Sequence, residues 1–236
     1  MNENQAICVL NFTNNDLFSK GIAYFYKDSN STNLKLILQN ITTEYGLLKG
    51  LHIHECGDVT DGCTSACDHY NPNNSSHGSL YSKNRHYGDL GNIEIDKNGS
   101  CKIEIKCIPL DIHRIVGRTL ILHASKDDLG EANKIYNNNP LVVSKKILDY
   151  LDNIYEICTG LMDNHPLLSK ELEEIITHDL VKLRENKKDD ELLYTVVYKC
   201  IKFIDTKCIE STKNGNAGAR IACGIIGYCK PKNILT

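Results

Sequence analysis

The feature that most constrains this chain is a group of histidines carried by short segments between residues 51 and 123. The full set comprises six histidines and one aspartate, namely His52, His54, His69, His77, His86, Asp89 and His123. It begins with Leu51-His52-Ile53-His54, and residues two apart project from the same face of a β-strand. We therefore expect the first two imidazoles to point to one side of one strand.

The next members of the set lie in a stretch from Gly57 to Leu90 that is rich in Gly and Asn and has no helical or strand periodicity. A loop of that length needs a reason to stay ordered, and a bound metal ion supplies one. Imidazole is the commonest ligand of zinc and copper, and three histidines with one carboxylate make a closed tetrahedral zinc site. Copper accepts a flatter set of nitrogens and leaves a position open to a small ligand.

A single His-x-His pair is more often an ordinary strand feature than a metal site. The complete set is different because it offers ligands for two ions. It predicts one closed site, which serves structure, and one open site, which serves chemistry.

The rest of the core is predicted to be antiparallel β-structure, because short alternating or apolar segments are set apart by turn residues. These segments are Ile7–Asn11, Ile22–Tyr26, Leu34–Ile41, Asn92–Asp96, Ser100–Ile105, Thr119–His123 and Arg220–Tyr228. Asp96-Lys97-Asn98-Gly99 is a hairpin signal. Strands with no helical period between them indicate a sandwich or a barrel.

Residues 131–207 follow a different pattern. Apolar residues recur at intervals of three and four over Ile147–Leu161, Leu172–Leu183 and Leu193–Ile204, which predicts three amphipathic helices. This segment holds 11 Lys or Arg and 14 Asp or Glu residues, against 16 and 16 elsewhere, so it carries the whole formal charge of −3. We expect a small α-helical subdomain inserted between 1–130 and 208–236. His165 and His178 within it have no ligand spacing.

Composition excludes several classes of protein. The 236 residues are 41% hydrophobic with a pI of about 6.3, so the chain is not basic enough to suggest nucleic-acid binding. No signal-peptide pattern and no apolar run long enough for a membrane span occur, so we expect a cytoplasmic protein. Eleven cysteines, an odd number, fit a reducing compartment better than a secreted disulfide framework.

Several segments, taken in order, resemble copper/zinc superoxide dismutases. Gly50–Asp58 resembles the family's first copper-ligand motif, and Gly62–Ala66 resembles its disulfide segment. The zinc loop is matched by His69–Pro72, His77–Gly78 and Arg85–Asn92. Gly117–His123 resembles the last copper-ligand strand, and Gly215–Gly224 resembles the closing segment. The resemblance covers residues 1–130 and 208 to about 229. It implies an eight-stranded antiparallel Greek-key β-barrel, an immunoglobulin-like sandwich, with 131–207 as an insertion in the channel-forming loop.

The resemblance also implies the metal ligands. Copper is expected on His52, His54, His69 and His123, and zinc on His69, His77, His86 and Asp89, so that His69 bridges the two ions. Asp127 matches an aspartate that hydrogen-bonds ligand histidines of both metals, which would fix their orientation. The competing interpretation is a family member that keeps the barrel without its metals, and the complete ligand set argues against it.

The implied function is superoxide dismutation, in which superoxide gives oxygen and hydrogen peroxide by copper redox cycling beside a structural zinc. Arg220 matches the arginine that binds the anion, because a guanidinium stays charged and offers several donors. His69 is expected to take up a proton. Lys213 resembles a lysine that steers the anion by its charge, and a solvated loop residue is an equally good interpretation.

Two further interpretations stay open. The chain could be a catalytically silent or copper-delivery protein on the same barrel, although Met1–Leu10 lacks the Met-x-Cys-x-x-Cys motif of copper chaperones and His123 is present. Alternatively, the barrel could be a scaffold for an insertion that binds an unknown partner.

The resemblance implies one intrachain disulfide, between Cys63 and Cys223. The other nine cysteines have no partner that we can name, and Cys67 is predicted to be a free thiol rather than a metal ligand. Cys56 stands where the family usually has an aromatic residue near its dimer contact.

We also expect a homodimer, since Ile115, Val116, Gly117 and Ile226 suit an apolar interface. A copper chaperone is a possible partner. Neither nucleic acid nor a membrane is expected to be one.

Overall fold

The computed structural model describes residues 3–13, 18–28, 31–130 and 209–230, together with Thr195, Lys199 and Thr206. The chain divides into two compact units, Met1–Gly130 with Thr212–Thr236 and Glu131–Ser211. Thr195, Lys199 and Thr206 are helical. The rest of the predicted helical insertion lies outside the described residues, and its boundaries stay a prediction.

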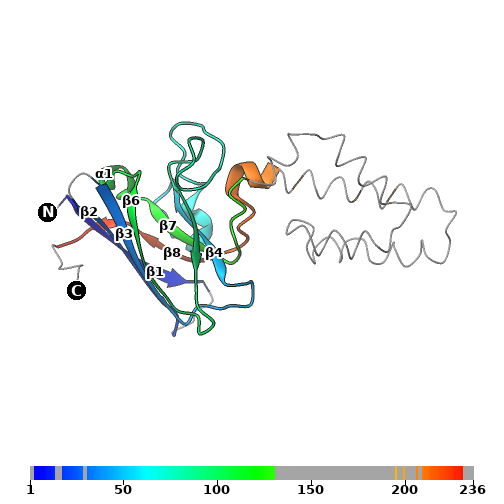
Figure 1. Ribbon diagram of the computed structural model, residues 1–236, viewed down its shortest axis with the longest axis horizontal. Coiled ribbons are helices and arrows are strands. Elements are labelled where there is room, and N and C mark those ends of the chain that lie inside the picture. The colour runs from blue at the N-terminus through cyan, green and yellow to red at the C-terminus, as the bar shows by residue number, and fades with distance from the viewer. Residues whose placement is uncertain are drawn as a thin grey trace. The chain divides into compact units, whose positions relative to one another are not determined.

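The first unit is built almost entirely from antiparallel strands (Figure 1). The strands are β1 (Gln5–Phe12), β2 (Lys20–Asp28), β3 (Ser31–Gln39), β4 (Leu48–His54), β5 (Asp89–Glu94), β6 (Cys101–Ile108), β7 (Thr119–His123), β8 (Arg220–Ile225) and β9 (Gly227–Tyr228). Short helical segments accompany them, among them the 3-10 helix η1 (Gly62–Ala66) and α1 (Ile112–Ile115). The predicted all-β class is confirmed.

The strands pair in the order β5-β4-β7-β8-β1-β2-β3-β6, and β9 pairs with the start of β1. The connections from β3 to β4 and from β6 to β7 join strands that are not neighbours, as a Greek-key barrel requires. β5 and β6 lie at the two ends of this order and are not paired in it, so the predicted hairpin is present only as a tight turn between them. In that turn Asp96 accepts the Gly99 amide through its carbonyl, and its Oδ1 accepts the amides of Asn98 and Ser100.

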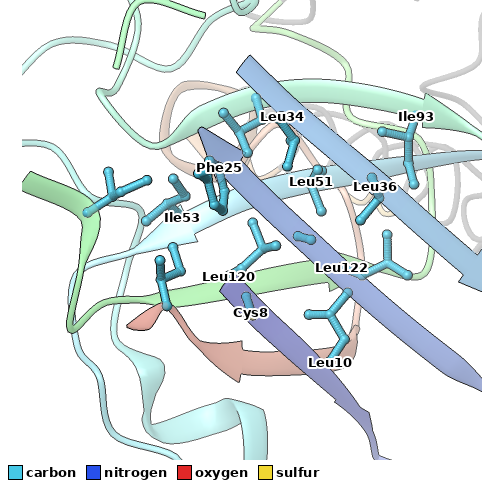
Figure 2. Packing of buried hydrophobic residues seen from close by; sticks show 14 of the residues in the cluster. Cys8, Leu10, Phe25, Leu34, Leu36, Leu51, Ile53, Ile93, Leu120 and Leu122 are labelled. Carbon is cyan, nitrogen blue, oxygen red and sulfur yellow. The ribbon is translucent and has the colours of Figure 1, made fainter. Parts of the chain in front are cut away.

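The core forms because successive side chains of a strand point to opposite faces, so that one face can be buried. On β1 the buried residues are Ala6, Cys8 and Leu10, at intervals of two. Figure 2 shows Phe25, Leu34, Leu51 and Leu120 among the side chains that fill the interior from opposite strands. This packed interior holds β4 and β7 in place, and both strands end in the histidine group.

Several strand boundaries differ from the prediction, and two of these differences concern strands next to the histidine group. β5 begins at Asp89 rather than Asn92, because Asp89 pairs with His52 of β4. The strand predicted over 220–228 is divided at Ile226, because β8 pairs with β7 and with the end of β1, whereas β9 pairs with the start of β1. Both differences come from pairing with strands distant in sequence.

Replacing Phe25 with alanine should lower the free energy of unfolding of the metal-free protein by about 3–5 kcal/mol. Phe25 is fully buried, and its truncation loses transfer free energy and leaves a cavity. Val9→Ala on the neighbouring strand, where the side chain is 57% exposed, should change stability by no more than about 0.5 kcal/mol. Urea unfolding followed by circular dichroism measures both, and similar losses from the two changes would contradict this assignment of the core.

Candidate metal centre

The first group of histidines gathers at the ends of two neighbouring strands. His52 and His54 lie near the end of β4, and His123 is the last residue of β7. His69 joins them from the long loop through an isolated antiparallel bridge to His54. All four are buried, and one ring nitrogen from each lies within 4.8 Å of the corresponding nitrogens of the other three.

The hydrogen bonds of these rings decide which nitrogen faces the group. His54 Nδ1 donates to the Cys67 carbonyl at 2.9 Å and His123 Nδ1 donates to the Gly218 carbonyl at 3.1 Å, because a carbonyl oxygen can only accept. His52 Nε2 lies 2.8 Å from Asp127 Oδ2. In each of these rings the other nitrogen therefore points into the group and carries a free lone pair.

The nitrogens that face the group have no hydrogen-bond partner among the described residues. They are His52 Nδ1, His54 Nε2, His69 Nε2 and His123 Nε2. Buried polar atoms are almost always satisfied, so four orphaned nitrogens at one point need an explanation. A metal ion that prefers nitrogen ligands fits this arrangement, and copper is such an ion.

Burial also keeps these four rings neutral, as metal ligation requires. It lowers the pKa of His52, His54 and His69 well below the usual value, and it lowers the pKa of His123 to about 4. The lone pairs are thus available at neutral pH.

The second group adjoins the first through His69 and converges on one carboxylate oxygen. Asp89 Oδ1 lies 2.9 Å from His69 Nδ1, 3.0 Å from His77 Nδ1 and 3.3 Å from His86 Nδ1. The close approach of His77 Nδ1 lacks the alignment of a hydrogen bond. Three nitrogens and a carboxylate directed at one point fit a closed zinc site.

In the second group the pKa shifts favour charged side chains, whereas in the first group they favour neutral ones. Burial tends to lower the pKa of His77, but its hydrogen bond to Asp127 and the adjacent carboxylate of Asp89 outweigh burial and raise that pKa to about 10. Burial tends to raise the pKa of Asp89, and its close contacts with the three histidines hold it well below its usual range instead. The backbone amides of Gly78 and His86 also donate to Asp89 Oδ2, at 3.1 and 2.8 Å.

Asp127 joins the two groups. Its Oδ2 lies 2.8 Å from His52 Nε2 and its Oδ1 lies 2.8 Å from His77 Nε2, and the residue is fully buried. Asn92 holds its backbone from β5, accepting the Asp127 amide at 2.7 Å and donating to its carbonyl at 2.8 Å. Asn92 is thus a residue of the site that no pattern in the sequence alone distinguishes.

Arg220, the first residue of β8, lies opposite His123 of β7. Its guanidinium is half-buried and donates to the carbonyls of Cys63 at 2.9 Å, Thr64 at 3.3 Å and Cys67 at 2.6 Å. Burial lowers its pKa from the usual value, and a guanidinium still stays charged at neutral pH. These bonds use at most three of the five N–H groups of the guanidinium.

The structure contains the Cys63–Cys223 disulfide, which ties the loop to β8. It also contains a second disulfide, Cys56–Cys67. The prediction that Cys67 is a free thiol is therefore wrong, because the fold brings these two cysteines to a Cα–Cα distance of 5.5 Å across the paired chains next to His54 and His69.

Two other predicted features are placed differently from expectation. Lys213 is exposed, as predicted, but it lies in a helical turn over residues 209–214 rather than in a loop. Ile115 and Ile226 are fully buried in the core, so they offer no surface to a dimer contact. No helix among the described residues is long and apolar enough to cross a membrane.

Antiparallel β-strands that carry two adjoining groups of buried nitrogen and carboxylate ligands define a metalloprotein with a two-metal centre. A family model for copper/zinc superoxide dismutase (SODC) matches residues 19–142, just over half of the chain. The chain belongs to the copper/zinc superoxide dismutase family. The match includes every histidine of both groups and ends before Arg220 and Cys223.

Individual relatives agree with this family. The chain is 41% identical over 114 residues to a superoxide dismutase [Cu-Zn] of Paramecium bursaria Chlorella virus 1, and the aligned region covers 47% of this chain and 60% of that protein. It is 38% identical over 130 residues to one of Pleurocordyceps sinensis, covering 54% and 82%. It is 39% identical over 129 residues to an extracellular superoxide dismutase [Cu-Zn] of Brugia pahangi, covering 53% and 62%.

Replacing Asp127 with asparagine should weaken zinc and copper binding by about 10- to 100-fold, because the carboxylate orients a histidine of each group. Competition with a chelator for each metal measures this change. Asp128→Asn at the neighbouring position, where Asp128 lies outside both ligand groups, serves as the control. Equal affinities for the Asp127 variant and the unmodified chain would contradict its orienting role.

The metal-free protein should lose stability as the pH falls below about 6.5. His52, His54, His69 and His123 have lowered pKa values in the folded state, so the unfolded chain binds protons first. Their contribution is present above the ordinary histidine pKa and is lost as the pH falls toward the folded pKa, by up to about 1.4 kcal/mol per pH unit for each ring. The raised pKa of His77 acts in the opposite sense, adding stability that is lost as the pH rises toward about 10.

Urea unfolding of the metal-free protein between about pH 5 and pH 8 measures this dependence. Below about pH 6.5 only the four rings with lowered pKa values change the proton balance between the two states, so stability should rise with pH there; above it only His77 contributes, so stability should fall, and the maximum should lie near pH 6.5. A flat profile below about pH 6.5 would contradict the neutral state of the four rings.

Proposed function

We propose that this chain catalyses the dismutation of superoxide, with copper on His52, His54, His69 and His123 and zinc on His69, His77, His86 and Asp89. The observation that carries the proposal is the set of four orphaned imidazole nitrogens, one of which belongs to a ring shared with the second group. A bound copper ion would supply one-electron redox chemistry, which no side chain here supplies. Zinc has no redox chemistry and would hold the loop and the orientation of the shared ring.

The reaction converts two superoxide ions and two protons into oxygen and hydrogen peroxide, and the chain's own residues would serve its charge and its protons. Arg220 would attract and orient the anion, since it lies opposite His123 and donates to the same Cys67 carbonyl as His54. His69 would hold a proton at Nε2 for the peroxide product, because its Nδ1 already faces Asp89 at 2.9 Å. The carboxylate of Asp127 would keep His52 and His77 oriented throughout.

Lys213 would add attraction at longer range. It is exposed, so its effect should fall on the rate of arrival and should fade as salt screens it. The excess of acidic residues in 131–207 would act in the opposite direction if it faces the same entrance.

A superoxide-dismutation assay on the full chain, reconstituted with both metals, tests the proposal. His123→Ala should lower the activity by at least about 100-fold, since it removes a ligand from the redox ion. His113→Ala is the matched control, because His113 is exposed, hydrogen-bonds Tyr228 and lies outside both groups, and it should retain full activity. An intact chain that binds both metals and is inactive would favour the copper-delivery or silent alternative.

The same assay across ionic strength addresses steering. The rate of the intact chain should change with salt, and Lys213→Gln should be slower by roughly twofold at low salt and equal at high salt. A rate independent of salt in both proteins would show that Lys213 does not steer the anion.

We also propose a homodimer in the cytoplasm, with a copper chaperone as a possible source of copper. Family membership supports the dimer and the chaperone, and the odd number of cysteines supports a reducing compartment. With Ile115 and Ile226 buried, a dimer contact would have to use other residues. Sedimentation of the purified chain tests the dimer, and cell fractionation tests the location.

A further inference from the structure

The Cys56–Cys67 disulfide lies directly beside the copper-binding histidines. His54 lies opposite His69 in the isolated bridge, and the Glu55 amide donates to the Asp68 carbonyl at 2.9 Å. The same antiparallel register continues one position further to Cys56 and Cys67, which are bonded through their sulfurs. The disulfide therefore crosslinks the paired segments that carry two of the four histidines.

Cys67 is also the residue whose backbone touches both His54 and the anion-binding arginine. Its carbonyl accepts from His54 Nδ1 at 2.9 Å and from an N–H of Arg220 at 2.6 Å. The direction of this single carbonyl thus helps to set the orientation of a metal ligand and of the guanidinium. A rotation of the peptide group would disturb both.

The backbone of Cys67 is held in a conformation that a side chain disfavours. Its φ is 65° and its ψ is −155°, a region that is populated almost only by glycine. A residue with a Cβ stays there only where its surroundings impose the conformation. The hydrogen bonds from His54 and Arg220 favour it, and the covalent link to Cys56 restricts the alternatives.

We propose that the Cys56–Cys67 disulfide is a positioning element for the copper site: it holds Cys67 in this conformation so that its carbonyl can orient His54 and Arg220 together. Of the proposed function, this inference assumes only that the four histidines bind copper. It assigns a role to a crosslink that is separate from Cys63–Cys223, since that bond ties the loop to β8 and does not include Cys67.

Four variants of the full chain separate this role from a general stapling of the loop. Cys56→Ala removes the crosslink and leaves a side chain at position 67. The double change Cys56→Ala with Cys67→Gly also lacks the crosslink but lets position 67 adopt its conformation without strain. The double change Cys56→Ala with Cys67→Ala is its matched control, and Cys101→Ala controls for the loss of a cysteine outside both disulfides.

The first measurement is made without metal, so that it does not depend on activity. Hydrogen exchange of the Glu55 and Cys56 amides, which donate to the carbonyls of Asp68 and Ala66, should be faster by about tenfold or more in Cys56→Ala, because the pairing opens more readily. The Cys67→Gly double variant should restore most of the protection. Cys101→Ala should resemble the unmodified chain.

The second measurement uses the copper(II)-loaded, zinc-loaded proteins and azide as an anion probe. Cys56→Ala and the Cys67→Ala double variant should show an altered electron paramagnetic resonance spectrum and about tenfold weaker azide binding, since a misplaced guanidinium loses a charge-assisted contact. The Cys67→Gly double variant should return both readouts toward the unmodified values. Alkylation and peptide mapping should find Cys56 and Cys67 protected in the unmodified protein.

Each opposite result overturns the proposal. If Cys56→Ala leaves the spectrum, the azide affinity and the exchange unchanged, the crosslink has no positioning role. If the glycine variant is as impaired as the alanine variant, the disulfide acts as a staple and not through the Cys67 carbonyl. If both thiols alkylate freely, the crosslink is absent in solution. A protein that shows all the expected shifts yet has no dismutase activity would overturn the proposed function and leave this inference standing.

Discussion

The structure depends on the pairing of β4 with a neighbour on each side. β7 and β5 hold this strand by backbone hydrogen bonds along both edges, so the positions of His52 and His54 are set by the sheet rather than by their own rotamers. β7 also delivers His123, and β5 begins at Asp89, a residue of the second group. Two adjacent strand pairings thus bring ligands of both groups to one end of the barrel.

The loop from Gly57 to Leu90 returns to this strand and completes the centre. It lies against β4 through hydrogen bonds of Ile53 with Tyr70 and Gly88. Gly88 has to be glycine, since a Cβ there would meet the Ile53 carbonyl oxygen at 2.1 Å. This close approach explains how a segment with little regular structure places His69, His77 and His86 with the accuracy that a metal site needs.

The site balances two kinds of buried polar group. The first group buries lone pairs with no partner, which is costly without a metal, whereas the second buries a carboxylate that is compensated by three histidines. Asp127 couples them, since its two oxygens face a histidine of each group. Its own backbone is fixed by Asn92, so the link between the groups is anchored to β5.

The class of fold and the identity of the ligand side chains follow from the amino-acid pattern alone. The short apolar runs of β1 and β7 and the His-x-His pair of β4 can be recognised locally, because side chains two apart on a strand share one face. The register between distant segments follows only from the folded barrel. It set Asp89 at the start of a strand, buried Ile115 and Ile226, used Asn92 to hold Asp127, and placed Cys56 opposite Cys67. The physical reason is that strand pairing over tens of residues is chosen by the packing of the whole barrel, which no local pattern encodes.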